Sequence, residues 1–372
     1  MRGKQACLIV NPKEGKNLAH LKEIRKIFKE AGWKTRFEVK LFGGQTLALA
    51  KEAAERGDDL IVAYGGDGTI SQVINGVMDA RGKRTHPVVG IIPGGTANVW
   101  ATELGIPLDP VQAVHTLLES EVRKVDLGCV DVAQLSIEPA SGEPFQENVK
   151  TLRNKGKKTS LPKARHYFLL MAGLGVDAAV MGNVSDNLKD QVGPLAVGVS
   201  AAEKVPEQQP FRVELSIPGA GKQDESFWDG EAIQIVIGNT RSYANITDMT
   251  PNAYIDDGIL DICVIEAGDP VSMTKQILSL VLRHKPDNVT AEFFHSAQFT
   301  LRVPASVQMQ VDGSTMRLKD YLDKPKRAIL KQEQDAARVM VEYRFEAVPR
   351  TLNMAFPITY DNALFEHEKD DV

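Results

Sequence analysis

Apolar residues in the first third of the chain fall into two alternating patterns. Short unbroken runs such as Leu60–Ala63 are typical of strands buried on both faces, whereas apolar residues three or four positions apart, as in 18–28, are typical of helices packed on one face. Phe37, Val39 and Leu41 alternate, which places them on one face of a strand. The pattern predicts strands at 6–10, 35–41, 60–63 and 88–92, and helices at 18–28, 45–56, 70–77 and from 110 onwards. Strands and helices that alternate through short loops predict a parallel sheet covered on both faces.

The pattern changes after about residue 122, where strand-like segments dominate. Strands are expected at 125–128, 168–172, 211–217, 232–238, 259–265, 299–303 and 307–311, with one clear helix at 273–284. Many short strands with few helices predict an antiparallel sandwich or barrel. Two polar segments, 139–165 and 318–338, are interpreted as insertions, the second with a helix at 325–337. The tail from His367 is polar and acidic, and we expect it to be disordered.

A glycine-rich loop, Gly65–Thr69, joins the strand at 60–63 to the helix at 70–77. Glycines let the main chain approach a ligand closely, and a helix start offers N–H groups and a positive dipole end to an anion. Asp67 in this loop would repel bare phosphate, so the loop favours a nucleotide polyphosphate that carries Mg²⁺. The alternative is a tight strand–helix turn without a ligand. Two further loops, 11–16 and 94–98, also follow predicted strands, and in a parallel sheet all three would meet at one edge.

Composition narrows the function classes. The net charge of -5 argues against a nucleic-acid-binding protein, which would carry a basic surface. The three cysteines are scattered and lack metal-site spacing, so we expect reduced thiols in a cytoplasmic protein. No apolar stretch reaches the length of a transmembrane helix, and the apolar run at 6–10 is too short for a signal peptide. Any membrane contact is therefore expected to be peripheral.

One segment suits an anionic membrane. Seven cations lie between Lys150 and Arg165, with no carboxylate among them. Such a cluster is attracted to anionic lipid headgroups, and a solvated loop without a partner is an equal alternative. The sequence leaves the oligomeric state open, with a homodimer as one alternative.

The glycine-rich loops belong to a longer series of motifs. The series comprises Asn11-Pro12-x-x-Gly15-Lys16, Gly65-Gly66-Asp67-Gly68-Thr69 with Val73-Ile74-Asn75-Gly76, Pro93-Gly94-Gly95-Thr96-Ala97-Asn98, Val125-Asp126-Leu127-Gly128, Gly238-Asn239 with Tyr243, Asp256-Asp257-Gly258 and Val311-Asp312-Gly313. In order and rough spacing, from about Ala6 to Pro357, it resembles the soluble bacterial diacylglycerol kinase-type lipid kinases, whose catalytic fold is shared with sphingosine and ceramide kinases. The glycine-rich loop alone is shared with NAD kinases, and the later motifs favour the lipid-kinase type.

The resemblance implies two domains with the active site in the cleft between them. An α/β nucleotide-binding domain with a parallel sheet would span 1–124 and be completed by 350–366, whose strand at 352–356 returns to it. An antiparallel β-sandwich domain that receives the lipid would span 125–349 and carry both insertions.

The resemblance also implies site residues. Those that would contact ATP are Asn11, Lys16, Lys40, Gly65, Gly66, Asp67, Gly68, Thr69, Ile70, Ser71, Gly95, Thr96 and Asn98. Asp257 and the main-chain carbonyls of Tyr254 and Ile259 would form a Mg²⁺ site, because a turn that offers one carboxylate and carbonyls suits a hard cation. The alternative for Asp257 is an ordinary Asp-Gly turn.

The chain departs from the family pattern at its carboxylates. Ser314 stands where the family usually has a Glu that is taken as the base, and Gln72 and Val99 stand where it often has Glu and Asp. A Ser hydroxyl is a poor base at neutral pH, so Asp312 or Asp67 would accept the proton. Phosphoryl transfer depends mainly on positioning and charge neutralisation, and a missing base slows it without necessarily abolishing it.

We therefore predict an ATP- and Mg²⁺-dependent kinase that phosphorylates the hydroxyl of a lipid at a membrane surface, with Asp67, Asp312 and Ser314 at its catalytic centre. Two alternatives remain. One is a lipid- or nucleotide-binding protein of the same fold that has lost catalysis, which the missing carboxylates favour. The other is a kinase of a soluble substrate such as NAD, against which the loop at 93–98 argues.

Overall fold

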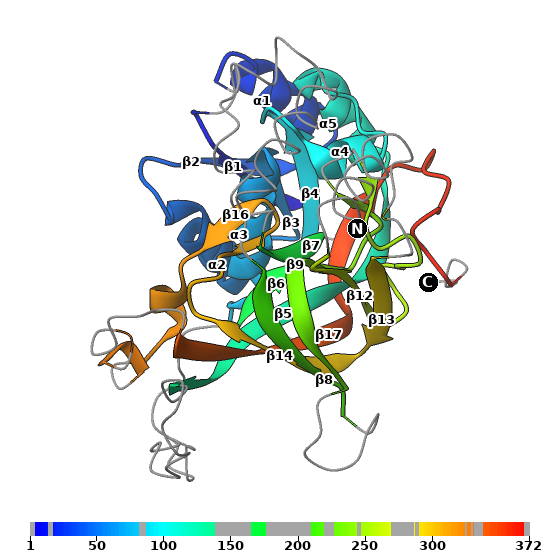
Figure 1. The fold of residues 1–372 in the computed structure, drawn as a ribbon. Helices are drawn as coiled ribbons and strands as arrows, with labels where there is room; N and C mark the ends of the chain where they lie inside the picture. The colour runs from blue at the N-terminus through cyan, green and yellow to red at the C-terminus, as the bar shows by residue number, and fades with distance from the viewer. Residues whose placement is uncertain are drawn as a thin grey trace, which may run out of the picture.

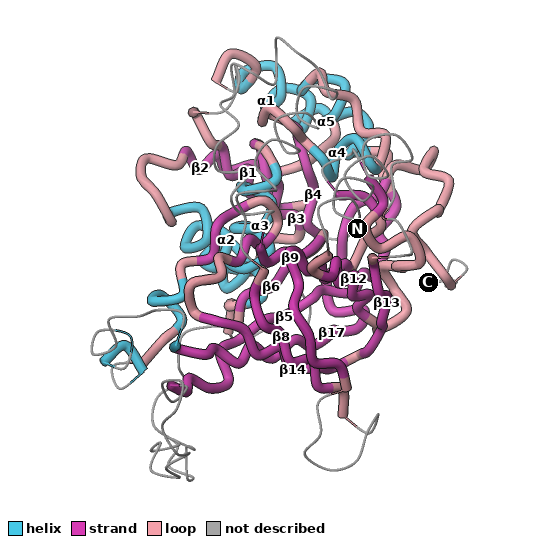
Figure 2. Tube along the Cα trace, in the orientation of Figure 1, coloured by secondary structure: helices cyan, strands magenta, loops and turns pink. Residues whose placement is uncertain are grey.

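The structure divides into a part that mixes helices with parallel strands and a part made almost entirely of antiparallel strands (Figure 1). The computed structural model describes residues 4–13, 18–81, 87–137, 165–175, 210–218, 227–243, 247–268, 286, 290–323, 326–328, 330 and 338–367. Figure 2 shows most of the described helices gathered at one end of the molecule and the strands continuing beyond them. The expected fold class, an α/β part with a parallel sheet followed by an antiparallel β-sandwich, is confirmed.

Four parallel strands form the sheet of the N-terminal part, in the order β4-β3-β1-β2. Their bounds are β1 (Gln5–Val10), β2 (Lys34–Val39), β3 (Leu60–Gly65) and β4 (Val88–Pro93). All six residues of β3 are buried, as an unbroken apolar run requires. Strand β2 ends at Val39, so the expectation that Leu41 faces the core from a strand is wrong, and its side chain is 77% exposed.

Helices cover this parallel sheet. They are α1 (Leu21–Glu30), α2 (Gln45–Arg56), α3 (Asp67–Met78), α4 (Val99–Glu103) and α5 (Pro110–Leu118). Helix α2 packs against α3, and α1 packs against α5, and the two pairs lie on opposite faces of the sheet (Figure 1). Local chemistry sets their ends: the Asp109 carboxylate accepts N–H groups of Val111 and Gln112 before the first turn of α5, and Gly57, with φ of 88°, ends α2.

The C-terminal part is built from antiparallel strands. They are β5 (Glu121–Ile137), β6 (His166–Phe168), β7 (Met171–Gly175), β8 (Phe211–Ser216), β9 (Trp228–Gly238), β12 (Leu260–Glu266), β13 (Ala291–Ser296), β14 (Gln298–Pro304), β15 (Met309–Val311), β16 (Ser314–Met316) and β17 (Val339–Phe356), with the short pair β10 (Ser242–Tyr243) and β11 (Thr247–Asp248) and a 3-10 turn at Leu318–Tyr321. The main path of the sheet runs β16-β15-β7-β9-β8-β14-β17 and then continues into the parallel strands.

One long strand, β17, belongs to both parts. It pairs antiparallel with β5 from Val339 opposite Ile137 to Phe356 opposite Glu121, and its Asn353 and Met354 pair in parallel with β4. The pairing is irregular between Val348 and Leu352, where Arg350 has φ of 46°. The two parts therefore share a hydrogen-bonded sheet, and the bulge marks the passage between them.

The structure corrects the strand expected at 168–172. The chain instead forms β6 and β7, separated by Leu169 and Leu170. Strands β13 and β16 were not predicted. The helix expected at 273–284 lies outside the described residues, as do parts of the helix expected at 325–337 and the tail beyond residue 367. Among the helices that the structure describes, none combines the length and apolarity needed to cross a membrane.

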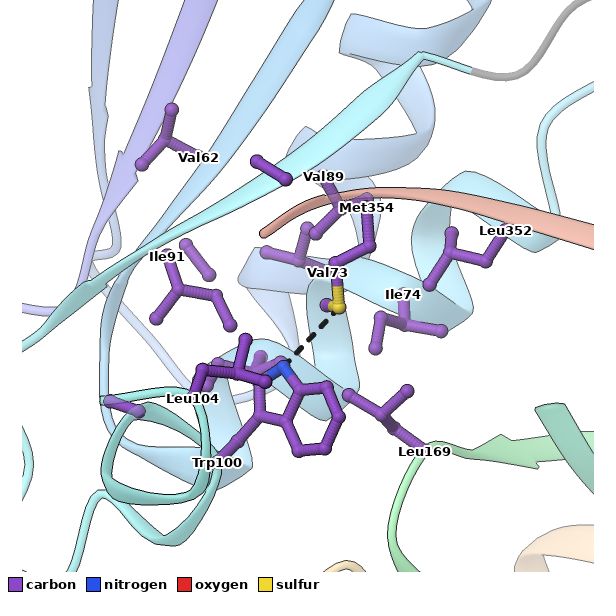
Figure 3. Close-up of a cluster of buried hydrophobic side chains, with 14 of the residues drawn as sticks. Val62, Val73, Ile74, Val89, Ile91, Trp100, Leu104, Leu169, Leu352 and Met354 are labelled. Atoms are coloured by element: carbon purple, nitrogen blue, oxygen red, sulfur yellow. Dashed lines mark hydrogen bonds between the residues drawn. The ribbon is translucent and has the colours of Figure 1, made fainter. Parts of the chain in front are cut away.

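The buried side chains form two cores. One lies on the parallel sheet, where the indole N–H of Trp100 donates to the sulfur of Met354 at 3.2 Å. Leu169, from the segment between β6 and β7, reaches this cluster beside Trp100 (Figure 3). The other core lies inside the antiparallel part, where the rings of Phe299 and Phe345 stack with centroids 5.1 Å apart. The C-terminal part is thus packed into the core of the N-terminal part.

Helices α2 and α3 approach so closely that Gly76 leaves no room for a side chain. A Cβ atom at this position would lie 2.3 Å from the Leu47 carbonyl oxygen and 2.7 Å from the Ala50 Cβ. We expect Gly76→Ala to lower the free energy of unfolding by about 1–3 kcal/mol, because the two helices must move apart. Gly43→Ala is the control, since no atom lies within 4 Å of its Cβ position. Equal urea midpoints for the two variants would contradict the prediction.

Candidate active site

Three loops meet at the carboxyl edge of the parallel sheet, as the sequence predicts. The Asn11 N–H donates to the Tyr64 carbonyl oxygen at 3.0 Å, and the Asn11 side-chain amide lies 3.4 Å from the Thr69 hydroxyl. The Gly94 N–H donates to the Gly65 carbonyl oxygen at 3.0 Å. Because β3 lies between β1 and β4, its loop Gly65–Thr69 is the centre of the site and is tied to both neighbours.

The loop after β4 is closed by Asn98 against Gly95. The Asn98 side chain accepts the Gly95 N–H at 2.9 Å and donates to the Gly95 carbonyl oxygen at 2.7 Å, with φ of 49° at Asn98. A Cβ on Gly95 would lie 2.5 Å from the Gly66 Cα. The glycines therefore let two main chains touch, and they leave the main chain open to a ligand.

Asp67 is the first residue of α3, and its carboxylate binds the start of α4. One oxygen accepts the Val99 N–H at 2.9 Å, and the other accepts the Trp100 N–H at 3.1 Å. The carboxylate caps α4 from a distance of more than thirty residues along the chain and fixes the third loop to the first turn of α3. Sequence reasoning assigned Asp67 to a metal and missed this capping role.

Asp312 brings the C-terminal part to this edge. Its carboxylate accepts the N–H groups of Leu169 at 3.0 Å, Leu170 at 2.9 Å and Met171 at 3.2 Å, the residues that interrupt the expected strand. Burial raises the pKa of the Asp312 carboxyl to about 6 against the lowering effect of these hydrogen bonds, and the nearby negative charge of Asp67 also raises it. The structure thus places Asp312 and Asp67 in one electrostatic neighbourhood.

Ser314 lies over the glycine-rich loop. A Cβ placed on Gly68 would be 3.6 Å from the Ser314 hydroxyl oxygen, which is ordinary van der Waals contact. Ser314 is exposed, and the turn before it contains Asp312 and Gly313 with φ of 46° and 72°. The exposed position 314 therefore faces the loop proposed for phosphate.

Asn75 couples α3 to β6, a role that the motif search did not assign. Its side-chain amide donates to the Tyr167 carbonyl oxygen at 2.8 Å and accepts the Tyr167 N–H at 2.9 Å. Asn239 acts similarly, donating to the carbonyl oxygens of Asp126 at 3.1 Å and Leu169 at 2.9 Å. Both residues lie in motifs that stand out in the sequence. The motifs alone did not show that these side chains bind main-chain groups of distant segments.

The other residues predicted to contact the nucleotide differ in burial and in position. Ile70 and Ser71 are buried in α3, Thr96 is exposed in the loop after β4, and Lys40 follows β2 at the same edge. Lys16 lies outside the described residues, and so does the basic segment except for Arg165, which forms an ion pair with Glu346 at 3.4 Å.

Several carboxylates lie close together at the turn predicted to hold Mg²⁺. The Asp257 carboxylate accepts the Ile259 N–H at 2.9 Å, and burial, with Asp261 and Asp126 nearby, raises the pKa of Asp257 to about 6. Buried Asp126 accepts the N–H groups of Gly258 at 2.6 Å and Arg350 at 2.5 Å and so fixes this turn to the bulge of β17.

The donor chemistry of this turn fits a hard cation, which would offset the crowded carboxylates. Within the described residues, no three His, Cys, Asp or Glu side chains are grouped as metal ligands, so a cation here would also need main-chain carbonyls.

The comparisons with known proteins agree with this geometry. Residues 5–130 match the diacylglycerol kinase catalytic domain, and residues 171–321 match the YegS C-terminal NAD kinase beta sandwich-like domain. Both parts of the chain thus resemble domains of the diacylglycerol kinase-type proteins. The two matches lie in the α/β part and in the antiparallel part, and they include Asp67 and Asp312 respectively.

Relatives of this family resemble the chain over most of their length. The diacylglycerol kinase of Bacillus subtilis (strain 168) is 26% identical over 314 residues, which cover 83% of this chain and 89% of that protein. The diacylglycerol kinase of Staphylococcus saprophyticus is 25% identical over 313 residues, covering 83% and 88%. A crystal structure of a diacylglycerol kinase from Bacillus anthracis strain Sterne superposes with a TM-score of 0.62 at 18% identity, covering 97% of this chain and 99% of that chain, which supports the fold.

The capping role of Asp67 predicts a loss of stability in Asp67→Asn. An amide nitrogen would replace one of two oxygens that each accept a main-chain N–H, and that N–H would lose its acceptor, at a cost of about 1–3 kcal/mol. Asp109→Asn is the matched control, because one oxygen of Asp109 accepts both N–H groups and Asn caps as well as Asp. Urea unfolding measures both, and equal losses would contradict the capping role.

The raised pKa of Asp312 predicts a pH-dependent cost of Asp312→Asn. Because the folded protein holds this proton to about pH 6 and the unfolded chain releases it near pH 4, the wild-type carboxyl contributes most stability at low pH and loses it as pH rises. The stability advantage of wild type over Asp312→Asn should therefore shrink by on the order of 2 kcal/mol between pH 4 and pH 7. Urea unfolding at pH 4, 5, 6 and 7 tests this, and a growing advantage would refute the assignment.

Proposed function

We propose that this protein transfers the γ-phosphoryl group of ATP to a hydroxyl group of a lipid, such as diacylglycerol or a sphingoid lipid. One observation carries the proposal most directly. The exposed Ser314, from the antiparallel part, has its hydroxyl oxygen 3.6 Å from the position that a Cβ on Gly68 would take, over the loop that suits a polyphosphate. An acceptor hydroxyl bound by the antiparallel part and a phosphate bound by the α/β part would meet where Ser314 faces this loop.

The nucleotide would be bound by the three joined loops. Gly66, Gly68 and Gly95 allow close main-chain approach, and the twelve-residue helix α3 points its positive end at the site. Asn11 and Thr69 supply polar side chains, with Thr96 and Lys40 at the rim. Lys16 is proposed to neutralise phosphate charge, as the family motif implies.

Mg²⁺ is proposed at two places. When bound, the ion would neutralise charge that develops on the transferring phosphoryl group. Asp67 would orient the ion through water, since each of its oxygens keeps a lone pair beyond its main-chain hydrogen bond. Asp257, with the carbonyls of Tyr254 and Ile259, would hold a second ion that stabilises the turn beneath Asp126.

Asp312 is proposed to position the acceptor and, in the absence of another carboxylate at position 314, to receive its proton. Its pKa of about 6 suits a base near neutral pH. Three main-chain N–H groups already occupy its oxygens, however, and the side chain is 5% exposed. Catalysis would then rest mainly on positioning and on charge neutralisation by the metal and the loops.

A lipid acceptor would require the protein to work at a membrane surface, and we propose that it does so as a peripheral protein of the cytoplasm. The basic segment 150–165 is proposed to help it dock on anionic lipid. A protein that binds lipid or nucleotide without catalysis stays an alternative because Gln72, Val99 and Ser314 lack carboxylates.

Transfer of labelled phosphate from ATP tests the proposal. Wild type is incubated with Mg²⁺ and, separately, with diacylglycerol, a sphingoid base, a bacterial lipid extract and NAD. Label in a lipid product supports the proposal, label in the NAD product supports a soluble acceptor, and label in neither, with nucleotide or lipid binding retained, supports the binding protein.

The position of Ser314 predicts the effect of restoring a carboxylate. If Asp312 does not act as the base and turnover is limited by the lack of one over the glycine-rich loop, Ser314→Glu should raise kcat on the best lipid several-fold or more. Ser314→Ala is the control and should leave kcat within about twofold, because a neutral hydroxyl contributes little as a base. A lower kcat in Ser314→Glu would indicate that Asp312 is the base and that a second carboxylate perturbs it.

A further inference from the structure

The most exposed large apolar side chains in the described part of the chain are neighbours. Leu41 is 77% exposed and Phe42 is 64% exposed. They lie in the loop between β2 and α2, at the edge of the sheet that carries the nucleotide loops. The Lys40 N–H donates to the Val10 carbonyl oxygen at 2.9 Å, which places this loop beside Asn11.

Hydrogen bonds fix both ends of the loop. The Leu41 N–H donates to the side-chain oxygen of Gln45, the first residue of α2, at 2.7 Å. Gly44, with φ of 77°, turns the chain into the helix, a conformation that favours glycine. The exposure of Leu41 and Phe42 is therefore a feature of the folded loop.

The loop itself carries positive charge, and the nearest carboxylates in the sequence are those of Glu38 and Glu52. Residues 39–51 contain Lys40 and Lys51 and no carboxylate. Leu18, which is 53% exposed, precedes α1 in the connection that follows the neighbouring strand β1. Apolar side chains at a loop tip beside a cation match the chemistry of an anionic bilayer surface, where the rings and chains enter the headgroup region and the ammonium group stays outside.

The loop lies on the side of the molecule from which a lipid substrate would have to reach the proposed site. In Figure 1 the connection from β2 to α2 projects on the same side of the molecule as β16, which begins with Ser314. A bilayer touching this tip would therefore lie on the side of the molecule that carries β16.

We propose that Leu41 and Phe42 insert into the surface of an anionic bilayer and hold the active site against it. This inference rests on the proposed function, because it assigns the membrane as the partner of that same site. The occupant of the loop surface is phospholipid, with Lys40 next to its anionic headgroups.

Vesicle binding tests the inference with a matched pair of variants. Wild type, Leu41→Ser/Phe42→Ser and Leu108→Ser/Phe293→Ser are sedimented with vesicles of 70% phosphatidylcholine and 30% phosphatidylglycerol. Leu108 and Phe293 are also exposed, at 62% and 40%, but lie between α4 and α5 and on β13. The partition coefficient should fall about tenfold or more in the first variant and stay within twofold in the control.

A second measurement reports depth. In Phe42→Trp, emission should shift to the blue on these vesicles and be quenched by brominated lipid, relative to wild type, whose own tryptophans provide the baseline. Unchanged emission, or equal losses of vesicle binding in both double variants, would overturn the inference. So would a change of oligomeric state in Leu41→Ser/Phe42→Ser by analytical ultracentrifugation, which would make the loop an interface between copies of the chain.

Failure of this inference and failure of the proposed function give different results. Phosphate transfer to a short-chain diacylglycerol in detergent micelles should be unchanged in Leu41→Ser/Phe42→Ser, while transfer to the same lipid in vesicles should fall. A raised KM for ATP in both assays would overturn the inference by placing the loop in the nucleotide site. Wild type that binds vesicles through Leu41 and Phe42 but transfers no phosphate would leave the inference standing and remove the proposed function.

Discussion

The Asp312 carboxylate is the interaction on which the site geometry depends. Its hydrogen bonds with the N–H groups of Leu169, Leu170 and Met171 hold the bend between β6 and β7. That bend lets Leu169 enter the core beside Trp100 in the α/β part (Figure 3). Because a buried N–H without an acceptor is costly, the bend and the carboxylate stabilise each other. Position 314 reaches the glycine-rich loop only while this turn is held.

The same type of interaction recurs elsewhere in the structure. Asp67 binds the start of α4, Asp126 binds the turn at Gly258 and the bulge at Arg350, and Asp256 accepts the N–H groups of Glu366 and His367. In each case a carboxylate accepts main-chain N–H groups of a segment distant in sequence. A charged acceptor makes a stronger hydrogen bond than a neutral one, so a few side chains can fix loops that have little regular structure of their own.

Much of this architecture follows from local sequence, and the part that does not has a physical reason. The bounds of α2 and the burial of β3 follow from helical spacing and an unbroken apolar run. The break at Leu169 does not, because the residues around it are all apolar and the interruption is imposed by Asp312, more than 140 residues away. Leu41 continues the alternation of β2, yet Gly44 and Gln45 end the strand before it. The motifs identified the loops that meet at the sheet edge, but they could not show that Asp67 is a cap.

Charge then constrains how such a site can work. Asp67 and Asp312 are close enough for the negative charge of one to raise the pKa of the other, and the main-chain hydrogen bonds lower the pKa of Asp312 without offsetting its burial. A third carboxylate at position 314 would add a like charge over the same loop, and only a bound cation could balance it. Because Ser314 is neutral, no extra cation is needed there, but under the proposed function the acceptor then has no base at position 314. Under the proposed function, the arrangement favours transfer that relies on the held loops and on a metal bound with the nucleotide, in which positioning contributes more than proton abstraction.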